Sequence, residues 1–199
     1  KENGLTGPET MPANGNLGNI SKLARIDLYF PKKPNGQMVV VCPGGGYSII
    51  SSYNEGLYVA DWFLSKGITV CVVKYRLPNF NHTVPYADVA NAFRYCRANA
   101  EAWGVKQIGV MGFSAGGHLA STAATHYVDA ATRPDFQILV YPVITFAKPY
   151  THNGSVEGLL GNNQTQELID LYSNHKQVTK DTPPAFILAA TDDFLVPIK

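Results

Sequence analysis

Apolar residues along the chain fall into short runs typical of buried strands and longer stretches with helical spacing. Residues 23–30 alternate between apolar and polar side chains, as a half-buried strand does, and end at Pro31. The other expected strands are at residues 38–42, 68–75, 107–111, 136–141 and 185–190. The expected helices are at residues 54–65, 85–103, 115–128 and 164–172. This alternation predicts an α/β fold, with a mostly parallel central sheet and helices on both faces.

Two segments lie outside this alternation. The first twenty-odd residues are rich in Gly, Asn and Pro, and we expect an irregular arm there. Residues 142–182 are longer than an ordinary crossover between strands. Because ligands bind at the carboxyl ends of the strands in open α/β sheets, this excursion is expected to form a cap that shapes a substrate site. Residues 1–199, with the excursion included, are the size of a single domain.

Composition excludes several classes of partner. Sixteen basic and fifteen acidic side chains among 199 residues leave no net field to attract nucleic acid or anionic lipid. No apolar run approaches the roughly 20 residues of a membrane helix. The three cysteines, Cys42, Cys71 and Cys96, have no metal-binding spacing. We expect buried thiols, no metal, and no nucleic-acid or membrane partner.

The sequence Gly-Phe-Ser-Ala-Gly at residues 112–116 has the G-x-S-x-G pattern of a nucleophile on a tight turn. A strand-like run precedes it and a helical pattern follows, which is the context that this motif requires. The glycines leave room for a strained backbone at Ser114. The N–H of Ala115 would then lie at a helix N-terminus, where it can stabilise an oxyanion. The alternative is a glycine-rich turn with an idle serine.

The sequence Pro-Gly-Gly-Gly-Tyr at residues 43–47 follows an expected strand and lies upstream of Ser114. Successive glycines let the main chain approach a carbonyl closely and direct N–H groups towards it. Gly45 and Gly46 are therefore the other candidates for the oxyanion hole. A phosphate-binding loop is the alternative, but no Lys-Ser or Lys-Thr follows the glycines.

Two acidic residues follow the strand expected at 185–190. A carboxylate at the carboxyl end of a strand, after the nucleophile in chain order, is the expected acid of a Ser–Asp–His triad. Asp193 is the better candidate, and Asp192 is expected to cap the turn. The alternative is a pair of solvated turn aspartates.

Together, the segments at residues 43–47, 73–77, 85–88, 112–120, 141–142 and 192–197 resemble the esterase/lipase branch of the α/β-hydrolases. The resemblance is strongest to the bacterial acetyl-xylan-esterase-like group. It implies a serine carboxylic ester hydrolase that cleaves short acyl esters of carbohydrates through an acyl-enzyme, without a cofactor. It also implies that Tyr47 borders the site, and that the protein is secreted or periplasmic, with a cytoplasmic location as the alternative.

One part of the family pattern is missing. In the family, a histidine on a loop after one more strand completes the triad, but no histidine follows Asp193 here. We interpret residues 1–199 as a chain that lacks the last strand and helix, and we expect it to be poorly active. An in-chain base is the alternative, and His118, one helical turn after Ser114, is expected to have a packed supporting role. His152 and His175 lie in the excursion and are expected to be solvated.

Two other functions fit the same residues. A serine peptidase of the dipeptidyl or prolyl type uses the same mechanism, although such enzymes usually carry a large additional domain. A catalytically silent binding protein on the hydrolase scaffold is the third possibility. The expected ligand in all cases is a small molecule or an oligosaccharide.

Overall fold

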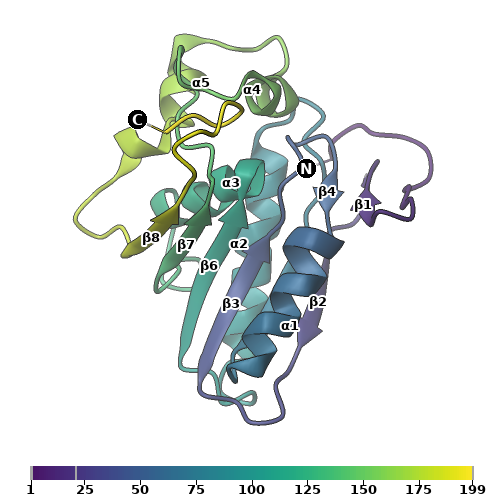
Figure 1. Ribbon diagram of the computed structural model, residues 1–199, viewed down its shortest axis with the longest axis vertical. Coiled ribbons are helices and arrows are strands. Elements are labelled where there is room, and N and C mark those ends of the chain that lie inside the picture. The colour runs from purple at the N-terminus through teal and green to yellow at the C-terminus, as the bar shows by residue number, and fades with distance from the viewer. Residues whose placement is uncertain (1, 21, 199) are drawn as a thin grey trace.

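The computed structural model describes residues 2–20 and 22–198, and a six-stranded sheet is its central element (Figure 1). The strands are β2 (Arg25–Tyr29), β3 (Gln37–Cys42), β5 (Thr69–Lys74), β6 (Gln107–Phe113), β7 (Gln137–Val140) and β8 (Ala185–Leu188). Their order is β2-β5-β3-β6-β7-β8, with β2 antiparallel to β5 and the other pairs parallel. The predicted mostly parallel sheet is confirmed.

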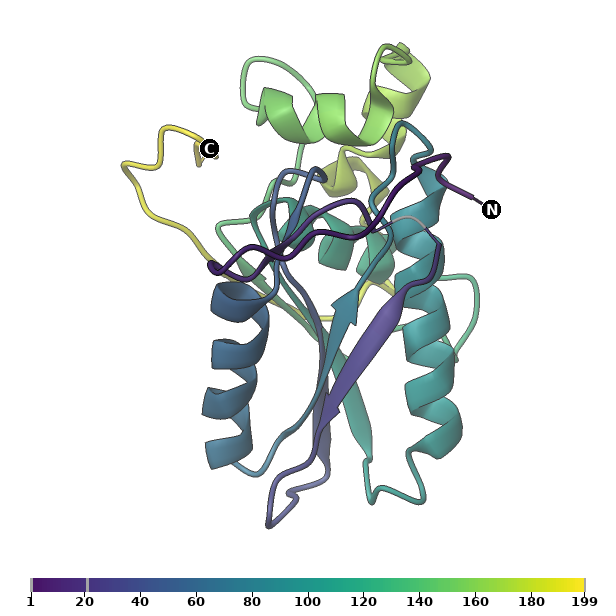
Figure 2. The same cartoon turned by 90° about the vertical axis from the view of Figure 1, so that its right-hand side faces the viewer.

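Helices cover both faces of the sheet, as predicted. Figure 2 shows α1 on one side of the sheet and α2 on the other. The π-helical turn η1 leads directly into α1, so the stretch predicted as one helix at 54–65 has two geometries. The helical segments are η1 (Tyr53–Leu57), α1 (Tyr58–Ser65), α2 (Thr83–Asn99), α3 (Ser114–Thr125), α4 (Asn153–Leu160), α5 (Gln166–Leu171) and the 3₁₀ turn η2 (Asn174–Gln177).

The core lies in two layers because side chains alternate along each buried strand. In β3, Met38 and Val40 pack on the side of α2 and α3, whereas Val39 and Val41 pack on the side of α1. All four side chains are almost completely buried. The three cysteines are free and buried within these layers, which confirms the prediction of buried thiols.

The N-terminal arm is more ordered than its composition predicts. Its short strand β1 (Asn16–Leu17) pairs with β4 (Ile50–Ser51) in a separate antiparallel ribbon. The buried side chain of Asn3 donates hydrogen bonds to the carbonyl oxygens of Ile20 (2.8 Å) and Leu77 (2.7 Å). These contacts with distant residues fix a segment that has little intrinsic propensity for regular structure.

Helix α4 lies in the excursion and is absent from the sequence prediction, because its two glycines lower the helical propensity. His152 caps its N-terminus by accepting the N–H of Ser155, and burial of Val156 and Leu159 supplies the missing stabilisation. Figure 1 shows α4 and α5 beyond the carboxyl ends of the strands. A role of residues 142–182 as a substrate cap stays a prediction.

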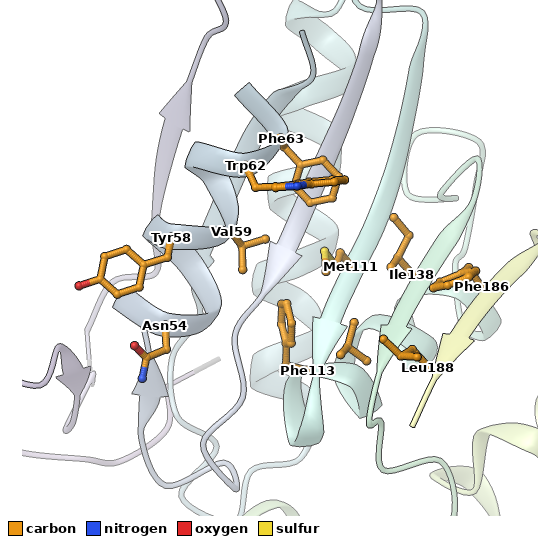
Figure 3. Close-up of a pocket in the computed structure, with 11 residues that line it drawn as sticks. Asn54, Tyr58, Val59, Trp62, Phe63, Met111, Phe113, Ile138, Phe186 and Leu188 are labelled. Atoms are coloured by element: carbon orange, nitrogen blue, oxygen red, sulfur yellow. The ribbon is translucent and has the colours of Figure 1, made fainter. Parts of the chain in front are cut away.

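Strand β8 is the edge of the sheet, and its apolar side chains are exposed. Phe186 and Leu188 are 62% and 54% exposed. Together with Tyr58 and Trp62 of α1 they line an apolar groove over β6 and β7 (Figure 3). Helix α1 covers only part of this face. Within the described residues, no helix or strand follows β8, and no helix is long and apolar enough to cross a bilayer.

A buried ion pair joins the sheet to α2. Asp88 of α2 is only 5% exposed and accepts hydrogen bonds from the backbone N–H of Arg76 (2.9 Å) and from its guanidinium (2.6 Å). Arg76 follows β5, so this carboxylate fixes the end of that strand against the helix. Removal of one partner from such a pair leaves the other charge without compensation.

We therefore expect Asp88→Ala to lower the free energy of unfolding by about 3 kcal/mol. Urea denaturation followed by circular dichroism measures this change. Glu9→Ala, which removes the surface ion pair with Arg25, is the control and should have a much smaller effect. Equal effects of the two substitutions would contradict the importance of the buried pair.

Candidate active site

Ser114 lies at the junction between β6 and α3. Phe113, the last residue of the strand, has an extended backbone (φ −121°, ψ 137°), and Ser114 begins the helix with a φ of +51°. A left-handed conformation of a non-glycine residue costs about 1–3 kcal/mol and persists only where the surroundings enforce it. The strand–turn–helix placement predicted for the G-x-S-x-G motif is thus confirmed.

Glycines at the two ends of the motif allow the backbones to approach closely. A Cβ atom on Gly112 would clash with the carbonyl oxygen of Gly116. A Cβ atom on Gly116 would clash with the carbonyl oxygens of Cys42 and Pro43. The first turn of α3 therefore lies directly against the end of β3, and the steric explanation for these glycines is confirmed.

The glycine loop after β3 is held by its carbonyl groups. The carbonyl of Pro43 accepts the hydroxyl of Tyr75 (2.8 Å), and that of Gly44 accepts the N–H of Ser51 (3.0 Å). The carbonyl of Gly45 accepts the N–H groups of Ser48 (3.0 Å) and Ile49 (3.1 Å). Since a trans peptide group is planar, each fixed carbonyl turns the next N–H in the opposite direction.

In the glycine loop, the backbone N–H groups of Gly45 and Gly46 are therefore free to bind a ligand. Among the described residues, no acceptor binds the N–H of Gly45 or Gly46. Both glycines have positive φ angles, +133° and +62°. Ala115 is the second residue of α3, where backbone N–H groups have no acceptor within the helix. These are the three donors predicted for the oxyanion hole, and that role stays a prediction.

A pocket of about 530 Å³ contains most of the predicted site residues. Ser114, Gly45, Gly46 and Asp193 line it, so three separated segments of the sequence meet at the carboxyl edge of the sheet. Ala115 is buried behind Ser114. The wall also contains polar residues that were not predicted from the sequence, among them Glu55, Tyr141 and His152.

Asp193 lies in the pocket wall but also performs the task that we expected of Asp192. Its Oδ1 accepts the N–H groups of Leu195 (2.9 Å) and Val196 (2.8 Å) and so caps the turn after β8. Asp192 is exposed to solvent. The prediction of Asp192 as the capping residue is wrong, because the backbone turns so that the second aspartate faces the following amides.

Tyr47 does not border the pocket with its side chain. The residue is 3% exposed, and its hydroxyl forms a 2.7 Å hydrogen bond with Nδ1 of His118. Its φ of +62° turns the ring under the glycine loop and into the core, where it contacts the ring of Tyr75. The side chain of Tyr47 therefore lies outside the pocket lining, and a contact of this residue with substrate stays a prediction.

His118 is completely buried in α3, one helical turn after Ser114. Its Nε2 lies 2.8 Å from the carbonyl oxygen of Tyr172, which can only accept, so Nε2 carries the proton and Nδ1 accepts the hydroxyl of Tyr47. The ring stacks on Phe146, with centroids 4.3 Å apart. Burial lowers the pKa of His118 to about 4. The packed, supporting role predicted for His118 is confirmed.

His152 is the histidine that the described residues bring to the pocket wall. Its Nδ1 accepts the N–H of Ser155 (3.2 Å), so the proton of the neutral ring is on Nε2. The expectation of a solvated loop histidine is wrong for His152 and correct for His175, which is exposed. Among the described residues, no histidine is hydrogen-bonded to Ser114 and no cluster of His, Cys, Asp or Glu could hold a metal ion.

A serine at a tight strand-to-helix turn, opposite a glycine-rich loop that follows a neighbouring parallel strand, defines the α/β-hydrolase fold. The BD-FAE family model matches residues 26–199, which is most of the chain. The chain therefore belongs to the BD-FAE family.

Three similar proteins support this assignment. An acetylxylan esterase from Xylanibacter ruminicola is 41% identical over 188 residues, which are 92% of this chain and 39% of that protein. Endo-1,4-beta-xylanase B from Butyrivibrio fibrisolvens is 38% identical, over 81% of this chain and 28% of its own length. The crystal structure of an acetyl ester-xyloside bifunctional hydrolase from Caldicellulosiruptor lactoaceticus aligns with a TM-score of 0.79 at 35% identity, over 88% of this chain and 69% of its own. The chain thus spans well under half the length of the two curated relatives.

Burial of His118 makes the stability of the fold sensitive to acid. The unfolded histidine binds a proton below about pH 6.5, whereas the buried ring resists protonation down to about pH 4. Between these values the unfolded state binds more protons, so stability falls as the pH falls. We expect this residue to account for a loss of about 3 kcal/mol between pH 7 and pH 4.

Urea unfolding at several pH values tests this expectation, with His118→Asn as the comparison. Asparagine keeps a polar side chain but does not titrate in this range, so the variant should be less stable at pH 7 and lose less stability on acidification. A variant with the same acid slope as the original protein would show that His118 does not cause the effect.

Proposed function

We propose that this chain carries the nucleophile and the oxyanion hole of a carboxylic ester hydrolase that acts on acyl esters of carbohydrates. One observation carries the proposal: Ser114, held at a φ of +51°, lines the same pocket as Gly45 and Gly46, whose N–H groups have no acceptor among the described residues. A nucleophile that faces preorganised donors is what acyl transfer requires.

In the proposed mechanism the Ser114 hydroxyl attacks the carbonyl carbon of a bound ester. The carbonyl oxygen becomes an oxyanion that accepts the N–H groups of Gly45, Gly46 and Ala115, and each such donor contributes about 3 kcal/mol to stabilisation of the transition state. The tetrahedral intermediate collapses, the alcohol leaves with a proton, and an acyl-enzyme remains. Water then attacks the acyl-enzyme and regenerates Ser114.

The proton transfers require a general base, and we propose that Asp193 orients a histidine for this task. Asp193 lines the pocket, and its Oδ2 atom is left for the histidine because Oδ1 binds the turn amides. Since no described histidine is hydrogen-bonded to Ser114, we propose that the base comes from outside residues 1–199.

Similarity supports the substrate class. The acetylxylan esterase and the acetyl ester-xyloside hydrolase named above share 41% and 35% identity with this chain. The first name refers to acetylxylan, and the second refers to an acetyl ester and a xyloside. We therefore propose small acyl esters, acetyl groups above all, on sugar or oligosaccharide alcohols as the substrates. The proposed reaction uses only the side chains and amides named above and the water that attacks the acyl-enzyme.

The Ser114→Ala variant of the intact protein tests the nucleophile. We expect kcat/KM for p-nitrophenyl acetate to fall by about 10⁴-fold or more, and release of acetate from acetylated xylan to stop. Labelling by a fluorophosphonate probe should also be lost. Ser48→Ala is the matched control, because Ser48 is an exposed serine in the glycine loop and should not affect either readout.

The competing functions predict other outcomes for the same protein. A serine peptidase would cleave aminoacyl-anilides faster than p-nitrophenyl acetate. A silent binding protein would not be labelled by the fluorophosphonate at all. Either result would refute the proposed ester hydrolysis.

Residues 1–199 produced alone test the source of the base. We expect them to hydrolyse p-nitrophenyl acetate about 10⁴-fold more slowly than the intact protein, because a triad member is missing. If the rates are instead equal, the base lies within residues 1–199. His152, which lines the pocket, would then be the first residue to substitute.

A further inference from the structure

Glu55 joins three elements of the pocket that are far apart in the sequence. It lies in η1, and its Oε2 accepts the N–H of Gly44 in the glycine loop. Its Oε1 accepts the hydroxyl of Tyr141, which follows β7, at 3.0 Å. The carboxylate is partly buried and lines the pocket together with Ser114. Neither Glu55 nor its two partners have a role in the mechanism above.

The packing around Gly44 places this carboxylate beside the nucleophile. A Cβ atom on Gly44 would lie 2.7 Å from Oε2 of Glu55, 2.7 Å from the carbonyl oxygen of Phe113 and 3.1 Å from Cβ of Ser114. The glycine loop, the nucleophile turn and the Glu55 carboxylate therefore meet at one point. A shift of the carboxylate would allow the loop to move relative to Ser114.

The hydrogen bond from Gly44 acts together with the carbonyl contacts of the loop to set the direction of the next amides. Because this N–H donates to Glu55, it is not available to an oxyanion. The same bond helps to fix the peptide group between Pro43 and Gly44. The carbonyl of Gly44 accepts the N–H of Ser51 at 3.0 Å, and this bond fixes the peptide group between Gly44 and Gly45. The N–H of Gly45 is then directed away from Ser51 and towards the open side of the loop.

Burial and hydrogen bonding act on the Glu55 carboxyl in opposite directions, and burial has the larger effect, so its pKa lies above the ordinary value. Burial raises the pKa of Glu55, whereas the bonds from Gly44 and Tyr141 lower it. Burial, followed by the charge of Glu55, raises the pKa of Tyr141, so its hydroxyl stays protonated and donates. Tyr141 has a strained φ of +36°, and its N–H is bonded to the carbonyl oxygen of Leu188.

We propose that Glu55, held by Tyr141, is a positioning residue that fixes Gly44 and thereby aligns the amides of Gly45 and Gly46 for the oxyanion. This inference rests on the proposed ester hydrolysis. It assigns Glu55 no proton transfer and no contact with the substrate. Because aligned amides act on the charge of the transition state, their loss reduces kcat more than it changes KM.

The test measures kcat and KM for p-nitrophenyl acetate in the intact protein and its variants. Glu55→Ala should lower kcat about 10- to 100-fold and change KM by less than about threefold, as expected when catalytic groups are misplaced by about 1 Å. Glu55→Gln should keep kcat within about fivefold, because an amide oxygen still accepts the Gly44 N–H and its NH₂ group can donate to Tyr141. Asp61→Ala removes an exposed carboxylate from α1 and is the control.

Tyr141→Phe tests the support of Glu55. This variant should lower kcat less than Glu55→Ala, and the double variant should match Glu55→Ala within about twofold, since Tyr141 acts through Glu55. Fully additive losses would overturn this arrangement. If Glu55→Gln is as slow as Glu55→Ala, Glu55 is a proton-transfer group, and the positioning role is wrong. An unchanged kcat in Glu55→Ala would also overturn the positioning role of Glu55.

Hydrogen–deuterium exchange provides a readout that does not depend on catalysis. Peptides that cover residues 42–48 should exchange faster in Glu55→Ala than in Asp61→Ala, because the Gly44 amide loses its acceptor. Equal exchange would refute the role of Glu55 in holding the loop. If the intact protein cleaves no ester but the exchange still differs, the proposed function fails while Glu55 is shown to hold the loop.

Discussion

Ser114 can keep its left-handed backbone only because three backbones meet around it without intervening side chains. The strained φ of +51° is enforced by contact between the start of α3 and the end of β3. Gly112 and Gly116 make this contact possible, and any side chain there would push the helix away from the strand. The position of Ser114 relative to the glycine loop follows from this contact, because both segments end at the same edge of a parallel sheet.

Further contacts support this junction from both sides. Below it, the buried ring of His118 joins α3 to Tyr47 of the glycine loop and to the carbonyl of Tyr172. Above it, Gly158 of α4 lies so close to the glycine loop that a Cβ atom there would clash with the carbonyl oxygen of Gly46. The glycine loop is thus fixed by the core, by the excursion and by the carboxylate of Glu55. Such preorganisation is what electrostatic stabilisation of an oxyanion requires.

Much of the fold follows from local patterns in the sequence. The six sheet strands and most helices lie close to their predicted positions, because apolar runs and helical spacing report directly on burial. The local pattern does not predict α4 or the pairing of β1 with β4. Both depend on contacts between distant residues, such as the burial of Leu159 and the pairing of Leu17 with Ile50, which override weak local propensities.

The sequence by itself determined the tight turn at Ser114 and the glycine loop, because the backbone conformations at Ser114, Gly45 and Gly46 demand particular neighbours or the absence of a side chain. Only the tertiary structure decided which other side chains reach the pocket. It placed Tyr47 in the core, although this tyrosine adjoins the loop, and brought Glu55 to the wall, although no motif marks it. The physical reason is that a side chain's direction depends on how the elements pack, and short motifs encode backbone geometry rather than packing.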